Sequence, residues 1–257
     1  MELLRQSALL FRMHFGSIAR SKRALVSLLL VAAPPVIGFL VVKFEDSDNI
    51  DELMAALGTM LLLQVITPLI SLIVGSAAVT EEVENRTITY VFTRPIHRAA
   101  LFLGRWFATV ALVSSLLVAS AAALVFVCGA GTGEVPAGMG PRLVIAAGVG
   151  GAVYSTIFAL IGVFLRRPMI LGLGYAFALE FLIANIPGSA QTLSVQFYLR
   201  SIYVQKELEV WVDGPEFLVV EELFEPRLAA LRLATTILIA LVVGSVGITR
   251  KQFVLTS

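Results

Sequence analysis

The stretch WFATVALVSSLLVASAAALVFVCGAGTG, residues 106–133, runs for 28 residues without a charged side chain. A transmembrane helix needs about 20 largely apolar residues, so this stretch predicts a helix that spans a bilayer. The whole chain has the same character: 58% of its 257 residues are hydrophobic, 14% are charged, and the mean hydropathy is +0.91. Soluble domains carry about 25% charged residues, because charge covers their surface. The composition therefore excludes a soluble enzyme and a disordered chain.

Six stretches of this kind follow one another along the chain. Two of them contain a single charge, Glu180 in the fifth and Arg232 in the sixth. The connections are short, except for a loop at 81–105 and another at 188–227. We therefore predict an all-α membrane protein with six transmembrane helices, at about 24–42, 53–80, 106–128, 143–165, 168–187 and 228–249.

Charged residues divide unevenly between the two sides of these spans. With the N-terminus inside, 13 of the 19 Lys and Arg residues lie on the inner side, and 13 of the 18 Asp and Glu residues lie on the outer side. The positive-inside rule then places both termini in the cytoplasm. The net charge of +1 gives no whole-molecule attraction to nucleic acid, so we expect no nucleic-acid partner.

Residues 1–23 precede the first span and mix leucine and phenylalanine with five basic residues. This pattern is typical of a basic amphipathic helix that lies on the inner leaflet, and a frayed lead-in segment is the alternative. In the fourth span, the spacing of Gly148 and Ala152 favours close approach of two helix backbones, either within one subunit or between two.

The sequence contains few residues that could bind a metal ion or a cofactor. Cys128 is the single cysteine, and the two histidines, His14 and His97, leave little for haem or zinc. We therefore expect no metal site and no catalytic residue. The phosphate-binding pattern GxxxxGK[ST] is absent from the sequence, so these residues cannot hydrolyse ATP by that route.

The loop at 81–105 reads EEVENRTITYVFTRPIHRAALFLGR. Its acids come first, where they favour a helix N-terminus, and Pro95 disfavours a helical conformation at Arg94. A short helix parallel to the membrane would transmit force from a soluble partner. From residue chemistry alone, an ordinary solvated loop with inner-side arginines explains the pattern as well.

This loop resembles the signature of the ATP-binding-cassette (ABC) type-2 transporter permeases. That signature has Glu-x-Glu-x-Gly-Thr, then a hydrophobic turn, a Pro with a nearby Arg, and Leu-Gly-Lys. Arg86 departs from it, because the family has Gly there, and Arg105 replaces the final Lys. The matching residues are Glu82, Glu84, Thr87, Arg94, Pro95, Arg98, Leu103 and Gly104.

The resemblance implies a non-catalytic permease subunit of an exporter in a bacterial cytoplasmic (inner) membrane. A separate soluble ABC ATPase, in two copies, would bind ATP and magnesium and dock on a coupling helix within 81–105. The coupling contacts would come from Glu82, Glu84, Thr87, Arg94, Pro95 and Arg98. The permease would pair in the bilayer with a second copy as a homodimer, or with a related permease. Short helices in the outer loop would cap the pathway.

Glu180 is the one acid deep within a predicted span, and a charge there is costly. As a pathway residue it would bind a cationic group or carry a proton. The structural alternative is a hydrogen bond to Gln64 or Tyr175, which the lack of a relay partner favours. In the outer loop, Phe197, Tyr198 and Arg200 are candidates for the outer gate or interface, and aromatic anchoring at the membrane surface is compatible with that role.

The alternative function is a stand-alone secondary transporter or channel. Such proteins usually carry several polar groups within the membrane and often an inverted repeat, and only Glu180 meets the first condition here. An intramembrane protease would need Ser/His, paired Asp or HExxH within the spans, whereas both histidines fall at the predicted cytoplasmic face. No feature of the sequence indicates the substrate.

Overall fold

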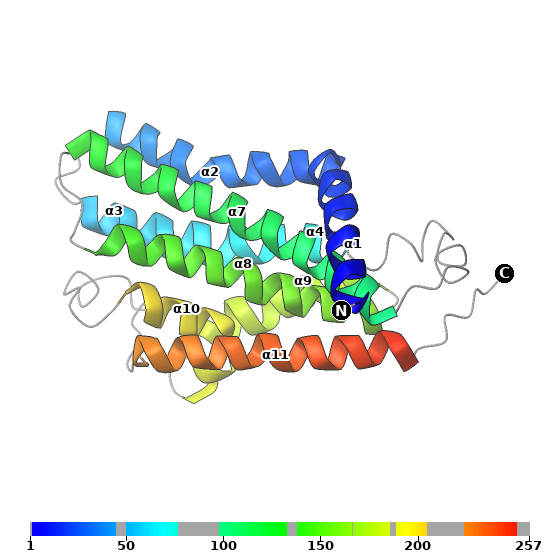
Figure 1. Ribbon diagram of the computed structural model, residues 1–257. Helices are drawn as coiled ribbons and strands as arrows, with labels where there is room; N and C mark the ends of the chain where they lie inside the picture. Colours follow the sequence, from blue (N-terminus) through cyan, green and yellow to red (C-terminus); the bar gives the residue numbers. More distant parts are fainter. Residues whose placement is uncertain are drawn as a thin grey trace.

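The computed structural model describes residues 2–44, 50–76, 98–132, 138–165, 167–185, 189–204 and 224–250. All regular secondary structure within these ranges is helical, which confirms the all-α prediction. The helices lie side by side in one elongated bundle, with the N-terminal helix and the last described residues, at the end of the final helix, near the same end of it (Figure 1).

Five helical segments of the described residues are long and apolar enough to cross a membrane, and they match five of the six predicted spans. The second is built from three consecutive pieces and is π-helical at its centre. The segments are α2 (Lys22–Phe44), α3 (Ile50–Ala56) with η1 (Leu57–Ile66) and α4 (Thr67–Gly75), α7 (Arg98–Thr132), α8 (Met139–Phe164) and α11 (Pro226–Arg250).

The stretch predicted as the fifth span, 168–187, forms a shorter apolar segment. It consists of α9 (Pro168–Tyr175), π-helical η2 (Ala176–Leu182) and a 3-10 turn, η3 (Ile183–Asn185). The apolar part, Pro168–Leu182, is about 22 Å long at 1.5 Å per residue, short of the roughly 30 Å hydrocarbon core. Five spans and this shorter helix are therefore described, and the six-span layout stays a prediction.

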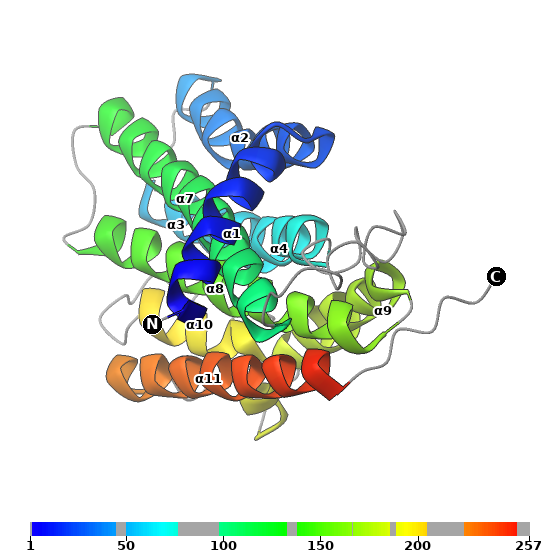
Figure 2. The same cartoon turned by 45° about the vertical axis from the view of Figure 1, so that its right-hand side comes forward.

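The chain then returns into the bundle through two short helices, η4 (Ser189–Leu193) and α10 (Val195–Tyr203). α10 packs against α8 and α11 (Figure 2), and eight of its nine residues are buried. α10 falls within the stretch 188–227, and the assignment of that stretch as a helical outer loop stays a prediction.

The N-terminal helix α1 (Glu2–Ala19) runs across the end of the bundle, transverse to the spans (Figure 1). It crosses α7 at Gly104, where an added Cβ would lie 2.7 Å from the Ser7 carbonyl oxygen and 2.8 Å from the Leu10 Cβ. Only glycine permits so close an approach. The opposite face of α1 exposes Met13 (75%) beside Arg12, as the predicted interfacial helix requires.

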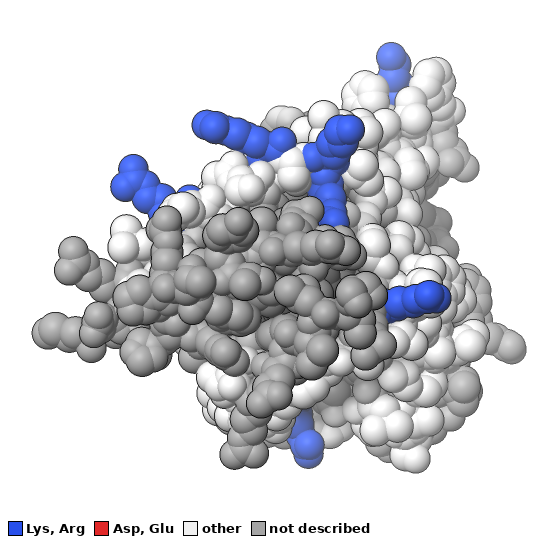
Figure 3. All heavy atoms as spheres, turned by 90° about the vertical axis from the view of Figure 1, so that its right-hand side faces the viewer, with Lys and Arg blue, Asp and Glu red and all other residues white. Residues whose placement is uncertain are grey.

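Basic residues gather at the end of the bundle that α1 covers. Figure 3 looks onto this end and shows blue Lys and Arg side chains around its rim and, among the described atoms visible there, no red acid. The described basic residues of α1, of the start of α2 and of the residue before α9 are Arg12, Arg20, Lys22, Arg23 and Arg167. The orientation of the chain in the membrane stays a prediction, under which this end would be the inner face.

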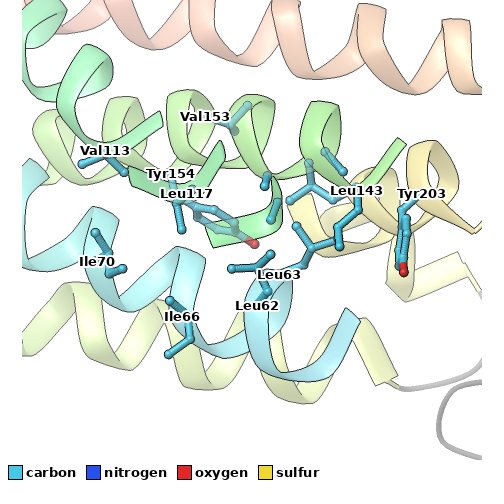
Figure 4. Packing of buried hydrophobic residues seen from close by; sticks show 14 of the residues in the cluster. Leu62, Leu63, Ile66, Ile70, Val113, Leu117, Leu143, Val153, Tyr154 and Tyr203 are labelled. Carbon is cyan, nitrogen blue, oxygen red and sulfur yellow. The ribbon is translucent and has the colours of Figure 1, made fainter. Parts of the chain in front are cut away.

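α8 is the central helix and packs against α4, α7, α9, α10 and α11. Side chains from η1, α4, α7, α8 and α10 meet around it in one buried cluster (Figure 4). On the α7 side, the Ser114 hydroxyl donates to the Gly148 carbonyl at 3.0 Å, and a Cβ on Gly151 would lie 3.2 Å from the Ser114 Cα. The small residues of α8 therefore serve contact within one subunit.

A second buried cluster joins α7, α8 and α11 near the α1 end of the bundle. Its largest member is Trp106, whose indole nitrogen donates to the Thr156 hydroxyl at 2.8 Å. Thr156 in turn donates to the Ala152 carbonyl at 2.6 Å. This chain of hydrogen bonds fixes the rotation of α7 against α8.

Candidate functional site

The predicted coupling residues lie almost entirely outside the described part of the chain. Arg98 is the first residue of α7. The loop is flanked by the last residues of α4 and the first residues of α7. Both of these helix ends lie beside α1 at the basic end of the bundle (Figure 1). The coupling roles therefore stay predictions. The residues outside the described ranges are Glu82, Glu84, Thr87, Arg94 and Pro95.

Three hydroxyl groups surround the carboxylate of Glu180, which is fully buried (0% exposed) on η2. Tyr154 and Ser194 donate to Oε2 at 2.6 and 2.9 Å, and Tyr175 donates to Oε1 at 2.8 Å. Tyr154 comes from α8 and Tyr175 from α9, so the carboxylate links three segments of the chain. The structural role predicted for Glu180 is a hydrogen bond to Gln64 or Tyr175. The structure has the bond to Tyr175, whereas Gln64 bonds Arg200.

The same carboxylate caps the N-terminus of α10. The backbone N–H groups of Val195 and Gln196 donate to it at 3.3 and 3.1 Å, and the N-cap residue Ser194 accepts from the Gln196 N–H at 3.0 Å. An anion at this position satisfies amides that have no partner within the helix, and it complements the helix dipole. All five contacts of Glu180 are hydrogen-bond donors, so both of its side-chain oxygens act as acceptors.

The side of α10 is bound to the other π-helical segment, η1. The side-chain amide of Gln196 donates to the Leu63 carbonyl, and Arg200 donates to the Gln64 side-chain oxygen at 2.9 Å. Burial of such groups is costly unless they are hydrogen-bonded. Long π-helical segments are rare and π-bulges frequently lie at functional sites. Both π-helical segments of the described residues supply polar partners to α10.

The three outer candidates, Phe197, Tyr198 and Arg200, all lie on α10. Phe197 and Arg200 are buried, and Tyr198 is half-buried with its hydroxyl donating to the Thr192 carbonyl at 2.9 Å. The rings of Phe197 and Tyr198 pack edge-on against each other and against Phe224, with centroids 5.4 to 5.8 Å apart. Phe224 lies just before α11, so these rings fix α10 to the last span.

Sequence reasoning missed Tyr154, Ser194 and Gln196 as members of this polar cluster. Ser194 had a usable signal, because a serine before an apolar amphipathic stretch is a common N-cap. Tyr154 lies 26 residues before Glu180 in another helix, and no spacing rule connects the two.

His14 lies in the contact between α1 and α7. Burial, and then the positive charge of Arg105, lower the pKa of His14 from 6.5 to about 4. A released α1 would therefore bind a proton more readily than the docked helix. The docked state should be fully stable above pH 6.5 and lose stability as the pH falls towards 4.

Amide exchange of α1 measured against pH checks this expectation. The wild-type helix should exchange faster, relative to the intrinsic rates, as the pH falls through this window. His14→Gln should remove that dependence, and a pH dependence equal in both proteins would contradict it.

A family model described as "ABC-2 family transporter protein" matches residues 10–209 of the chain. The matched range includes four of the five described spans, the loop at 81–105, α10 and the whole Glu180 cluster. No curated protein matches this sequence.

Proposed function

Because the chain belongs to the ABC-2 transporter family, we propose that it is the permease subunit of an exporter in a bacterial cytoplasmic membrane. The family match over four apolar spans is the observation that carries the proposal. The chain is then a transport component, and the match does not favour a stand-alone secondary transporter or channel. Export and the bacterial inner membrane are inferences from the family resemblance, and the basic end of the bundle would be the cytoplasmic face.

The energy for transport would come from a separate soluble ABC ATPase present in two copies. Those subunits would bind ATP and magnesium, since the sequence here lacks the phosphate-binding loop. We assign their docking to residues 81–98, between α4 and α7. The basic end of the bundle, with α1 lying across it, supports docking on this face.

The permease would work as a homodimer. η3 and η4 are short 3-10 turns instead of regular α-helix, and two exposed leucines lie at their ends, Leu182 and Leu193. Irregular backbone at membrane depth is tolerated only where protein covers it or where it lines a water-filled cavity. The short α9–η2 segment beside it exposes a row of apolar side chains, and a second copy packed here would shield both features. That row contains Met169, Ile170, Leu171, Leu173, Phe177 and Phe181.

Co-purification with an ABC ATPase encoded beside this gene tests the proposal, and native mass spectrometry of the complex reports whether two permeases join two ATPases. Replacing Glu84 and Arg98 together by alanine should lower transport by about tenfold while the complex still forms. The reason is that two polar contacts at a docking surface contribute about 1.4 kcal/mol or more.

A double variant at the opposite end, Glu225→Ala with Arg227→Ala, makes the same change in charge on exposed residues and should transport normally. Normal transport in the Glu84/Arg98 variant would show that 81–98 is not the docking element. Failure to recover any ATPase with the permease would count against the permease assignment itself.

A further inference from the structure

α10 turns polar side chains into the bundle, and among them is a buried cation, Arg200. Gln196, Arg200 and Ser201 are buried, although an apolar helix would fill the same space without needing partners. Their partners are the Leu63 carbonyl and Gln64 of η1, and the Phe197 carbonyl for the Ser201 hydroxyl at 2.9 Å. Each of these contacts can be exchanged for a contact with water at modest net cost.

The two ends of α10 are attached differently. At its N-terminus, Glu180 receives five hydrogen bonds that include two backbone amides of the helix. At its C-terminus, the Tyr203 hydroxyl donates to the Met54 carbonyl at 3.1 Å and lies against Gly58, where a Cβ would come within 2.9 Å of it. The N-terminal attachment has more hydrogen bonds, because Glu180 accepts from two backbone amides of α10 and from the N-cap hydroxyl, whereas Tyr203 makes one hydrogen bond.

α10 closes one end of the bundle. Tyr203 reaches the start of the second span at Met54, and α10 packs along α8 and α11 at the end away from α1 (Figure 1). Under the proposed function this is the outer end, where an exported substrate leaves. A helix that closes this end with polar, water-exchangeable contacts is suited to move.

We propose that Glu180 is a positioning residue that holds α10 in a closed position, and that α10 leaves this position when substrate passes. The movement of α10 during transport, the gating half of this proposal, rests on the proposed function. The attachment of α10 by Glu180, the anchoring half, does not. Its two side-chain oxygens already accept five hydrogen bonds, so binding of a cation by Glu180 has no part in this scheme. Opening would break the contacts of α10 with Glu180 and η1 and replace them with water.

Amide exchange of residues 195–203 in the purified permease tests the anchor. Glu180→Ala leaves the two helix amides and three hydroxyls without their acceptor, so exchange in α10 should rise by about tenfold or more. Glu180→Gln keeps one acceptor oxygen, and its side-chain N–H group can donate to the Tyr175 hydroxyl oxygen. The rise in exchange should therefore be smaller than in Glu180→Ala. Tyr198→Phe removes one exposed hydrogen bond from the same helix and serves as the matched control.

Added acetate gives the anchor a positive test, since Glu180→Ala removes a group of the size of this ion from a ring of five donors. Acetate should slow the exchange of α10 in Glu180→Ala towards the wild-type rate and leave the wild type unchanged. Exchange in Glu180→Ala equal to that of the wild type would overturn the proposal. Faster exchange throughout α7 and α8 as well, without rescue by acetate, would also overturn it, because Glu180 would then support the whole fold.

The native thiol reports the movement. Cys128 is the only cysteine in the sequence, is fully buried, and belongs to the same cluster as Tyr203. Labelling of Cys128 by a maleimide should quicken in Glu180→Ala and, in the wild-type complex with its ATPase, during ATP turnover.

Unchanged labelling during measured turnover would overturn the gating half. Failure to assemble with any ATPase would overturn the proposed function and gating together, and the exchange result on the permease alone would still decide the anchor.

Discussion

Replacing Gly104 with leucine is expected to release α1 from the end of the bundle. Even the first added carbon would lie 2.7 Å from the Ser7 carbonyl oxygen and 3.3 Å from the Phe11 amide nitrogen, and backbone cannot move aside as a flexible side chain can. Overpacking of this kind costs about 1–3 kcal/mol. Amide exchange of α1 should therefore be faster by about tenfold or more, as measured by mass spectrometry on the purified protein.

Gly16 provides the matched control on the same helix. No atom lies within 4 Å of the position that its Cβ would take, and the residue is exposed. Gly16→Ala should stabilise α1 by about 0.5–1 kcal/mol, because alanine favours the helix. If α1 exchanges in Gly104→Leu at the same rate as in the wild type, the docking of α1 does not depend on this crossing. If the release of α1 also abolishes transport, α1 and the neighbouring loop at 81–105 act as one unit.

Trp106→Ala is expected to cost about 3 kcal/mol of unfolding free energy. Trp106 is 7% exposed and fills the cluster between α7, α8 and α11, and its indole binds Thr156. Lipid chains are as apolar as the side chains of this cluster, so the cost arises from lost packing and from the cavity. Titration with a denaturing detergent measures the free energy.

The neighbouring residue supplies the control for this substitution. Phe107 is 52% exposed and meets Trp106 edge-on with ring centroids 4.5 Å apart, so Phe107→Ala removes a less buried aromatic ring and should cost less than about 1 kcal/mol. Trp106→Phe keeps most of the bulk and loses the hydrogen bond, for which about 0.6 kcal/mol is typical between transmembrane helices. Equal losses for Trp106→Ala and Phe107→Ala would contradict the packing assigned to Trp106.

The spans were predictable because a bilayer allows few solutions. A backbone in hydrocarbon must satisfy its own hydrogen bonds, so an apolar run of about 20 residues becomes a helix whatever its neighbours are. The run at 168–187 met the same criterion but forms a shorter helix. In that run, Glu180 accepts hydrogen bonds from residues 194–196, because the chain folds back into the bundle after the short helix. The apolar pattern of the sequence does not reveal this contact.

The site was only partly predictable for a related reason. Glu180 was identified because an acid in an apolar run is conspicuous, and Phe197, Tyr198 and Arg200 because they are aromatic or charged. Two of the five donors to Glu180 are backbone amides, and every residue has one, so they carry no signal in the sequence. Gly104 was recognised from a family pattern alone; its contact with the Ser7 backbone explains why glycine is needed there.

The buried carboxylate also has a consequence for how the protein is made. When the ribosome has delivered the short segment Pro168–Leu182 to the translocon, Glu180 raises the free energy of its insertion by about 3 kcal/mol, and only Tyr154 and Tyr175 have been synthesised as partners. The remaining three donors follow within 16 residues of the acid. We therefore expect stable insertion of this segment to require the first turn of α10, so that the two enter the membrane as a single hairpin-like unit.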